Sequence, residues 1–236
     1  MRRYFRTFLA VGLLSLTASC GRNASDRALS VTIATNKGDI EIMLFNETPD
    51  HRDNFADMCG NGFYDSLLFH RVIESFVIQT GDPQSKGAAA GVALGDGEGG
   101  DKVHPEIKDG LYHIRGAVGA AREGDAANPQ RLSSGSHFYI VQGGNKVTDN
   151  MLNKSHIIYP DSVRRLYREL GGTPHLDGAY TVFGYVINGM DVVDAIAATA
   201  TDANDRPVDD IIITGTTLKR LSAEETKKYY RQYHAE

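Results

Sequence analysis

Alternating apolar and polar residues mark the first regular structure in the chain. Residues 31–33 and 40–44 carry Val, Ile or Leu at every second position, and the polar residues 36–39 lie between them. A period of two on both sides of a turn sequence predicts a β-hairpin. Short runs of small, aromatic or β-branched residues predict further strands at residues 116–121, 138–142, 181–186 and 211–213.

Apolar residues at helical spacing predict four helices. Thr48 followed by Pro49 is typical of a helix start, and glycines at positions 60 and 62 end the apolar pattern that follows. Residues 163–170 carry apolar side chains at i, i+3, i+4 and i+7, between a Pro-Asp start and a Gly-Gly stop, which predicts an amphipathic helix. We expect the other two helices at residues 190–197 and in the tail 222–236, which should lie on the surface.

The segment 69–83 carries the first candidate chemistry. Its apolar pattern is irregular at Glu74-Ser75, which predicts two short strands joined by a turn. Arg71 and Gln79 lie among Phe, Val and Ile, where they could present hydrogen-bond donors at the edge of an apolar surface. Such an arrangement suits the binding of a carbonyl group beside a hydrophobic one. The alternative is an ordinary strand whose polar residues face water.

Composition and charge limit the possible functions. The chain has 236 residues, 41% hydrophobic and 23% charged, which is typical of one globular domain plus a leader. Its formal net charge of −5 gives no reason to expect nucleic acid as a partner. The glycine-rich segment 81–110 contains several acidic residues, but their spacing is not that of a calcium loop. We expect an exposed loop there, with no metal and no cofactor.

The N-terminus resembles an export signal. Arginines at positions 2, 3 and 6 precede a short apolar stretch at residues 8–16, which is too short to span a bilayer but fits a signal peptide over residues 1–19. Residues 16–20 resemble a bacterial lipobox, so Cys20 is expected to carry lipid and residues 20–29 to form a tether. The alternative is a conventional signal with a chance cysteine. Cys59 would then be the only free cysteine, and we expect a small buried residue with no disulfide.

Several motifs, taken in order, resemble the cyclophilin-type peptidyl-prolyl isomerases. The strongest is Phe-His-Arg-Val-Ile at residues 69–73, followed by Phe76, Ile-Gln at 78–79 and Gly-Asp-Pro at 81–83. The others are Gly-Phe-Tyr-Asp at 62–65, Gly-Ala-Val-Gly-Ala-Ala at 116–121, Ser-Gly-Ser-His-Phe-Tyr-Ile at 134–140 and Leu-Asp-Gly-Ala-Tyr-Thr-Val-Phe-Gly at 176–184. The resemblance covers most of residues 30–220.

The resemblance implies a fold and a division of the chain. The fold would be mainly β, a closed antiparallel barrel of about eight strands capped by two helices. The isomerase domain would span residues 30–221, and the tail 222–236 would be helical. Residues 145–172 form a longer segment than most family members have, so we expect an extra helical insertion that packs against the domain. One hypothesis is that this insertion makes a partner site beside the pocket.

The resemblance also implies site residues. Arg71 would be the catalytic group that contacts the prolyl amide, and Gln79 would help to orient it. The side chains of Phe76, Val77 and Leu176 would line the proline pocket, and the backbone of Ala121 and Arg122 would hydrogen-bond the substrate. The remaining substrate-binding positions depart from the residues common in the family: His137 replaces Gln, Tyr139 replaces Phe, His175 replaces Trp and Tyr180 replaces His.

Two of these departures leave a question open. His137 could titrate near neutral pH and make turnover pH-dependent, or it could be a hydrogen-bonded polar residue of a strand. The Trp that His175 replaces contacts cyclosporin in the family, so binding of that drug is in doubt more than catalysis is.

The expected function is prolyl cis/trans isomerisation on unfolded or extended proline-containing chains in the cell envelope. The expected protein is a monomer held on the periplasmic side of a membrane by its lipid alone. The alternative is a proline-segment binding module or chaperone of the same fold that has lost catalysis.

Overall fold

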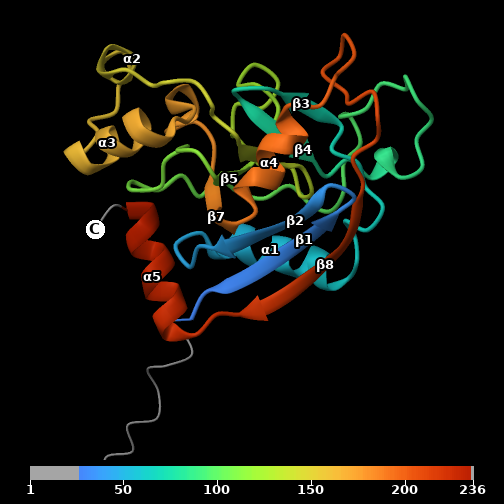
Figure 1. The fold of residues 1–236 in the computed structure, drawn as a ribbon, viewed down its shortest axis with the longest axis horizontal. Helices are drawn as coiled ribbons and strands as arrows, with labels where there is room; N and C mark the ends of the chain where they lie inside the picture. Colours follow the sequence, from blue (N-terminus) through green and yellow to red (C-terminus); the bar gives the residue numbers. More distant parts are fainter. Residues whose placement is uncertain (1–26, 235–236) are drawn as a thin grey trace, which may run out of the picture.

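The computed structural model describes residues 27–234. The expected signal peptide, Cys20 and most of the 20–29 tether lie outside the described residues. Within them the chain forms an eight-stranded antiparallel sheet that curls around a core (Figure 1). The strand order is β3-β4-β6-β5-β7-β2-β1-β8. The strands are β1 (Leu29–Thr35), β2 (Gly38–Leu44), β3 (Arg71–Ile73), β4 (Val77–Thr80), β5 (Ala117–Ala120), β6 (Phe138–Val141), β7 (Val182–Asn188) and β8 (Ile213–Arg220).

The two predicted hairpins are confirmed. Strands β1 and β2 pair up to Thr35 opposite Gly38, and the φ angle of Gly38 is +131°, which a residue with a Cβ rarely adopts. Strands β3 and β4 pair across the turn predicted at Glu74-Ser75, so that Arg71 lies opposite Gln79. Of the last predicted strand, at 211–213, only Ile213 belongs to a strand, as the first residue of the longer β8, and Ile212 forms an isolated bridge.

The edges of the sheet meet through a short connection instead of a full strand ladder. An isolated bridge pairs Leu68 with Ile212. The backbone N–H of Phe69 donates to the carbonyl of Ile211 at 2.9 Å, and the N–H of Ile213 donates to that of Leu67 at 2.9 Å. These bonds join the segment before β3 to the start of β8, so both sheet edges are partly satisfied.

The pleat of the strands sorts their side chains into two apolar clusters. On β6, Phe138 and Ile140 point into the cluster inside the curled sheet, while Tyr139 and Val141 belong to a second cluster on the other face. All four are buried. A sheet that is covered on both faces shows little alternation of apolar and polar residues, which explains the continuous apolar sequence of this strand.

Two helices contribute to the inner cluster, as expected. Helix α1 (Pro49–Gly60) buries Phe55, Ala56 and Cys59 there. Helix α4 (Met190–Ala197) buries Val193, Ile196 and Ala197 in the same cluster. Both have the bounds that the apolar spacing and flanking glycines predict.

The insertion and the C-terminal helix cover the second cluster. Helix α3 (Asp161–Leu170) lies where it was predicted and buries Val163, Leu166 and Tyr167. The short helix α2 (Asp149–Asn153), capped by Thr148, was not predicted because it is only five residues long. Helix α5 (Ala223–His234) is the predicted tail helix, but it is more than a surface element, since Tyr233 is 2% exposed and packs on Phe45.

No helix within residues 27–234 is both long and apolar enough to cross a membrane. The same residues contain no group of three or more His, Cys, Asp or Glu side chains placed to hold a metal ion.

Candidate active site

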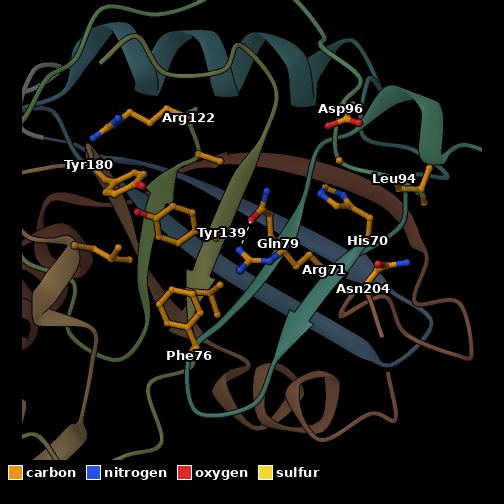
Figure 2. A pocket seen from close by; sticks show the side chains of 14 residues that line it. His70, Arg71, Phe76, Gln79, Leu94, Asp96, Arg122, Tyr139, Tyr180 and Asn204 are labelled. Atoms are coloured by element: carbon orange, nitrogen blue, oxygen red, sulfur yellow. Dashed lines mark hydrogen bonds between the residues drawn. The ribbon is translucent and has the colours of Figure 1, made fainter. Parts of the chain in front are cut away.

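A cavity of about 330 Å³ opens on the face formed by β3, β4, β5 and β6 (Figure 2). Loops from three distant parts of the sequence complete it, around residues 94–96, 176–180 and 204. Nine of the eleven candidate catalytic and substrate-binding residues line this cavity: Arg71, Phe76, Val77, Gln79, Ala121, Arg122, Tyr139, Leu176 and Tyr180. The sheet and its loops thus bring together residues more than one hundred positions apart, such as Arg71 and Tyr180.

One part of the cavity is apolar. The rings of Phe76 and Tyr139 and the side chains of Val77 and Leu176 all belong to the second apolar cluster or pack against it. The cross-strand pairing of β4 with β6 and of β6 with β5 sets these positions. Gly119 on β5 leaves room for the Tyr139 ring, because a Cβ there would lie 2.4 Å from Tyr139 Cζ. The result is a concave apolar surface suited to a small ring such as that of proline.

Arg71 and Gln79 lie at the edge of this apolar surface (Figure 2). Because they are opposite each other on β3 and β4, Arg71 Nη1 donates to Gln79 Oε1 at 3.3 Å. The Arg71 guanidinium also lies 5.9 Å from the centre of the Phe76 ring, and its Nε lies 3.8 Å from Asp205 Oδ2. Three neighbours therefore hold the guanidinium beside the apolar surface, with further N–H groups left for a substrate.

The backbone groups of Ala121 form hydrogen bonds within the protein, whereas those of Arg122 form none with the part of the chain that the structure describes. The N–H of Ala121 donates to the carbonyl of His137 at 3.0 Å, and its carbonyl accepts from the N–H of Ser134 at 2.9 Å. The backbone N–H and carbonyl of Arg122 have no hydrogen-bond partner within residues 27–234. Since successive residues of an extended chain direct these groups to opposite sides, Arg122 is the one of the pair that can bond a substrate backbone.

The Arg122 side chain supports the neighbouring loop. Its guanidinium lies over the Tyr180 ring, 4.4 Å from the centre, and its Nε donates to the carbonyl of Ala179 at 3.0 Å. Its Nη1 also pairs with Asp125 Oδ1 at 2.7 Å. These contacts hold the Tyr180 wall in place against β5.

Two candidate residues do not line this cavity. His137 is 5% exposed, and its Nε2 hydrogen-bonds to the carbonyl of Gly97. The structure thus favours the second interpretation of His137, a polar residue with a satisfied hydrogen bond. The exposed His175 stacks on Phe76, with ring centres 5.5 Å apart, but lines a different groove.

The histidine that does line the cavity is His70, which was not among the candidate residues. It is 3% exposed, and neither of its ring nitrogens has a hydrogen-bond partner within the described residues. Burial, with a smaller contribution from the nearby His137, lowers the pKa of His70 to about 4. The ring is therefore neutral at physiological pH, with one N–H donor and one acceptor nitrogen. Its position directly before Arg71 in the sequence was a usable signal.

The other unpredicted lining residues come from loops. Leu94, Gly95 and Asp96 belong to the glycine-rich segment that we expected to be a plain exposed loop, and Asn204 belongs to the loop before β8. The carboxylate of Asp82, which is 0% exposed, ties this loop down by accepting from the backbone N–H groups of Gln84 and Gly95. No local pattern predicts such contacts, because they depend on how the loop folds back over β4.

Comparison with known proteins identifies the class. Residues 30–218 match the family model described as cyclophilin-type peptidyl-prolyl cis-trans isomerase/CLD, so the chain belongs to this family. A putative peptidyl-prolyl cis-trans isomerase of Staphylococcus epidermidis is 36% identical over 194 residues, which cover 81% of this chain and 92% of the relative. A putative bifunctional phosphatase/peptidyl-prolyl cis-trans isomerase of Streptococcus pyogenes is 38% identical over 189 residues. The match covers 78% of this chain but only 37% of that longer relative.

Solved structures agree with the assignment. A cyclophilin-type peptidyl-prolyl cis-trans isomerase of Cryptosporidium parvum superposes with a TM-score of 0.59 at 26% identity, covering 81% of this chain and 98% of the other. A second structure of that protein, in the presence of the dipeptide Ala-Pro, has a TM-score of 0.58, also at 26% identity, and covers 80% of this chain and 98% of the other. The chain is thus a cyclophilin-type isomerase, with the mainly β fold expected from its motifs.

Proposed function

We propose that this isomerase accelerates the folding of exported proteins by acting on extended, proline-containing segments at the cavity of Arg71. The observation that carries the proposal is the cross-strand pair of Arg71 and Gln79 at the edge of an apolar pocket. The pocket would hold the proline ring, the backbone of Arg122 would bond the adjoining chain, and Arg71 would act on the amide.

The chemistry requires no nucleophile and no cofactor. Rotation about a peptide bond is slow because conjugation ties the nitrogen lone pair to the carbonyl, with a barrier of about 18 to 20 kcal/mol. In the twisted transition state the lone pair is localised and the nitrogen becomes a better hydrogen-bond acceptor. A donor placed beside the prolyl nitrogen therefore stabilises the transition state more than either planar ground state.

The position of Arg71 allows it to be that donor. Gln79, Phe76 and Asp205 restrain its guanidinium, so little side-chain entropy remains to be lost when the transition state forms. A hydrogen bond from a charged donor contributes about 1.5 to 3 kcal/mol, which corresponds to about ten- to a hundredfold in rate. Arg71 would then supply a large part of the acceleration, while the pocket supplies orientation.

The test is exchange NMR on a short Ala-Pro peptide with the full chain, with its Arg71→Ala variant and with Arg165→Ala as matched control. Arg165 is exposed on α3 and does not line the cavity. We expect wild type and control to accelerate exchange equally, and Arg71→Ala to lose about ten- to a hundredfold in kcat/KM. Binding of the peptide by folded wild type without acceleration would instead favour a non-catalytic binding module.

We also propose that the protein is exported and anchored by lipid on Cys20, facing the periplasm. The support is the basic start, the short apolar stretch and the small residues before Cys20 in the sequence. Cell fractionation tests this: we expect the wild type with the membranes and Cys20→Ala in the soluble fraction or unprocessed. A mature N-terminus without lipid, read by mass spectrometry, would contradict the anchor.

A further inference from the structure

A second groove shares a loop with the catalytic cavity. The loop at residues 174–180 contributes Leu176 and Tyr180 to the cavity, and contributes Pro174, His175 and residues 177–179 to a separate groove of about 560 Å³. The insertion forms another wall of the groove, through Met151 and residues 154–157. A family member without the insertion would therefore lack this wall.

His175 connects the two depressions. One face of its imidazole stacks on Phe76, which lines the catalytic cavity, with an angle of 22° between the rings. His175 itself lines the groove. Because an extended chain advances about 3.3 Å per residue, a peptide that leaves the cavity past His175 reaches the groove within a few residues of its proline.

A buried carboxylate holds the two walls together. The hydroxyls of Tyr159 and Tyr167, both from the insertion, donate to Asp177 Oδ2 at 2.8 and 2.5 Å. His113 donates to the other oxygen from its backbone N–H at 2.7 Å, and its Nδ1 lies 2.8 Å from that oxygen. The Asp177 side chain is 1% exposed, and both of its oxygens have partners inside the protein. Because these contacts already join the 174–180 loop to the insertion, the groove is formed before any ligand binds.

The side chains that face the groove favour an acidic ligand. Lys154 and Arg131 line it together with the imidazoles of His156 and His175, and Asp177 is the one acid that lines it among residues 27–234. Arg131 is already paired with Asp125 at 2.8 Å, whereas the exposed Lys154 has no ion-pair partner within residues 27–234. Lys154 is therefore the lining cation that can pair with an acidic ligand, on a chain whose net charge is −5. Met151, which is 47% exposed, adds an apolar contact at the rim.

We propose that the groove binds the segment of the client chain that flanks the prolyl bond, and that Lys154 selects clients with an acidic residue in that segment. The proposal rests on the proposed isomerase function and adds a substrate preference to it. The occupant is the client itself, because the groove shares the 174–180 loop with the cavity that takes its proline, and His175 lies between the two.

Peptides with one central Ala-Pro bond in a Ser- and Gly-rich chain provide the test. A single Glu is moved stepwise away from the bond on either side, and matched peptides carry Gln or Lys at the same positions. Exchange NMR measures KM and kcat separately for wild type, Lys154→Glu and Lys37→Glu. Lys37 lies in the β1–β2 turn, is exposed and changes the net charge by the same amount, so it is the matched control.

We expect Glu at one position to lower KM about two- to fivefold relative to Gln for wild type and Lys37→Glu at low salt. In Lys154→Glu, Lys should become the preferred residue at that position. Added salt should weaken both preferences. An unchanged Glu preference in Lys154→Glu, an equal reversal in Lys37→Glu, or no effect of Glu at any position would overturn the proposal. Failure of the isomerase function looks different, since then no peptide would be accelerated, charged or not.

Discussion

The carboxylate of Asp177 offers the strongest test of how the insertion is attached to the domain. It accepts hydrogen bonds from the backbone of His113 and from the hydroxyls of Tyr159 and Tyr167, and it lies beside the His113 ring. The replacement Asp177→Asn keeps the shape of the side chain but removes its charge and turns one acceptor oxygen into an NH₂ donor. Whichever way the amide is turned, the groups on one side lose their acceptor and face an NH₂ group, and those on the other side keep only a neutral carbonyl.

The lost hydrogen bonds set the size of the change in the free energy of unfolding. Each hydrogen bond to a charged group contributes about 1.5 to 3 kcal/mol, so losing two costs about 3 to 6 kcal/mol. The new amide can donate to one tyrosine oxygen and recover about 1 kcal/mol. We therefore expect Asp177→Asn to lower the free energy of unfolding by about 2 to 5 kcal/mol, and Tm by about 5 to 15 °C for a domain of this size.

Urea unfolding followed by circular dichroism measures the change. Tyr167→Phe removes one of the bonds and should cost about 1.5 to 3 kcal/mol. Asp209→Asn, at an exposed position, is the matched control and should stay within about 0.5 kcal/mol of wild type. If Asp177→Asn unfolds like the control, the carboxylate does not hold the insertion, and the groove is not preformed.

Three further predictions concern single buried positions. Because the pKa of His70 is lowered from 6.5 to about 4, the unfolded chain binds a proton that the folded chain does not. The free energy of unfolding should then fall by up to about 3 kcal/mol as pH drops from 6.5 to 4, and an equally steep fall in His70→Gln would contradict this. Burial raises the pKa of Cys59 to about 12, so iodoacetamide at neutral pH should modify this thiol only in urea. Mass spectrometry of the peptide that contains Cys59 measures the modification, and rapid labelling of the native chain would show that Cys59 is not a buried, protonated thiol. Gly119→Ala places a Cβ 2.4 Å from Tyr139 Cζ, so the free energy of unfolding should fall by about 1 to 3 kcal/mol and KM for the Ala-Pro peptide should rise. Wild-type values for both quantities would show that the Tyr139 ring has room to move.

Elements whose signals are local can be predicted from the amino-acid sequence alone. The hairpin of β1 and β2, helices α1, α3 and α4, and the turn that places Arg71 opposite Gln79 all follow from apolar period, a helix start or stop, or a turn sequence within a dozen residues. The motif around Arg71 also indicated the family and most of the side chains that line the cavity.

Which of two neighbouring groups faces the cavity depends on how the elements pack in three dimensions. His70 lines it and His137 does not, although both were visible in the motifs, because the turn of the chain before β3 and before β6 sets the direction of each ring. The same holds for Arg122, whose backbone has no hydrogen-bond partner in the described part of the chain, while that of Ala121 bonds to His137 and Ser134. The groove beside the cavity, and the position of the loop residues Asp96 and Asn204 in the cavity wall, arise from contacts between distant segments. Such contacts leave no periodic trace in the sequence, since they depend on the packing of whole elements and not on the spacing of residues within one.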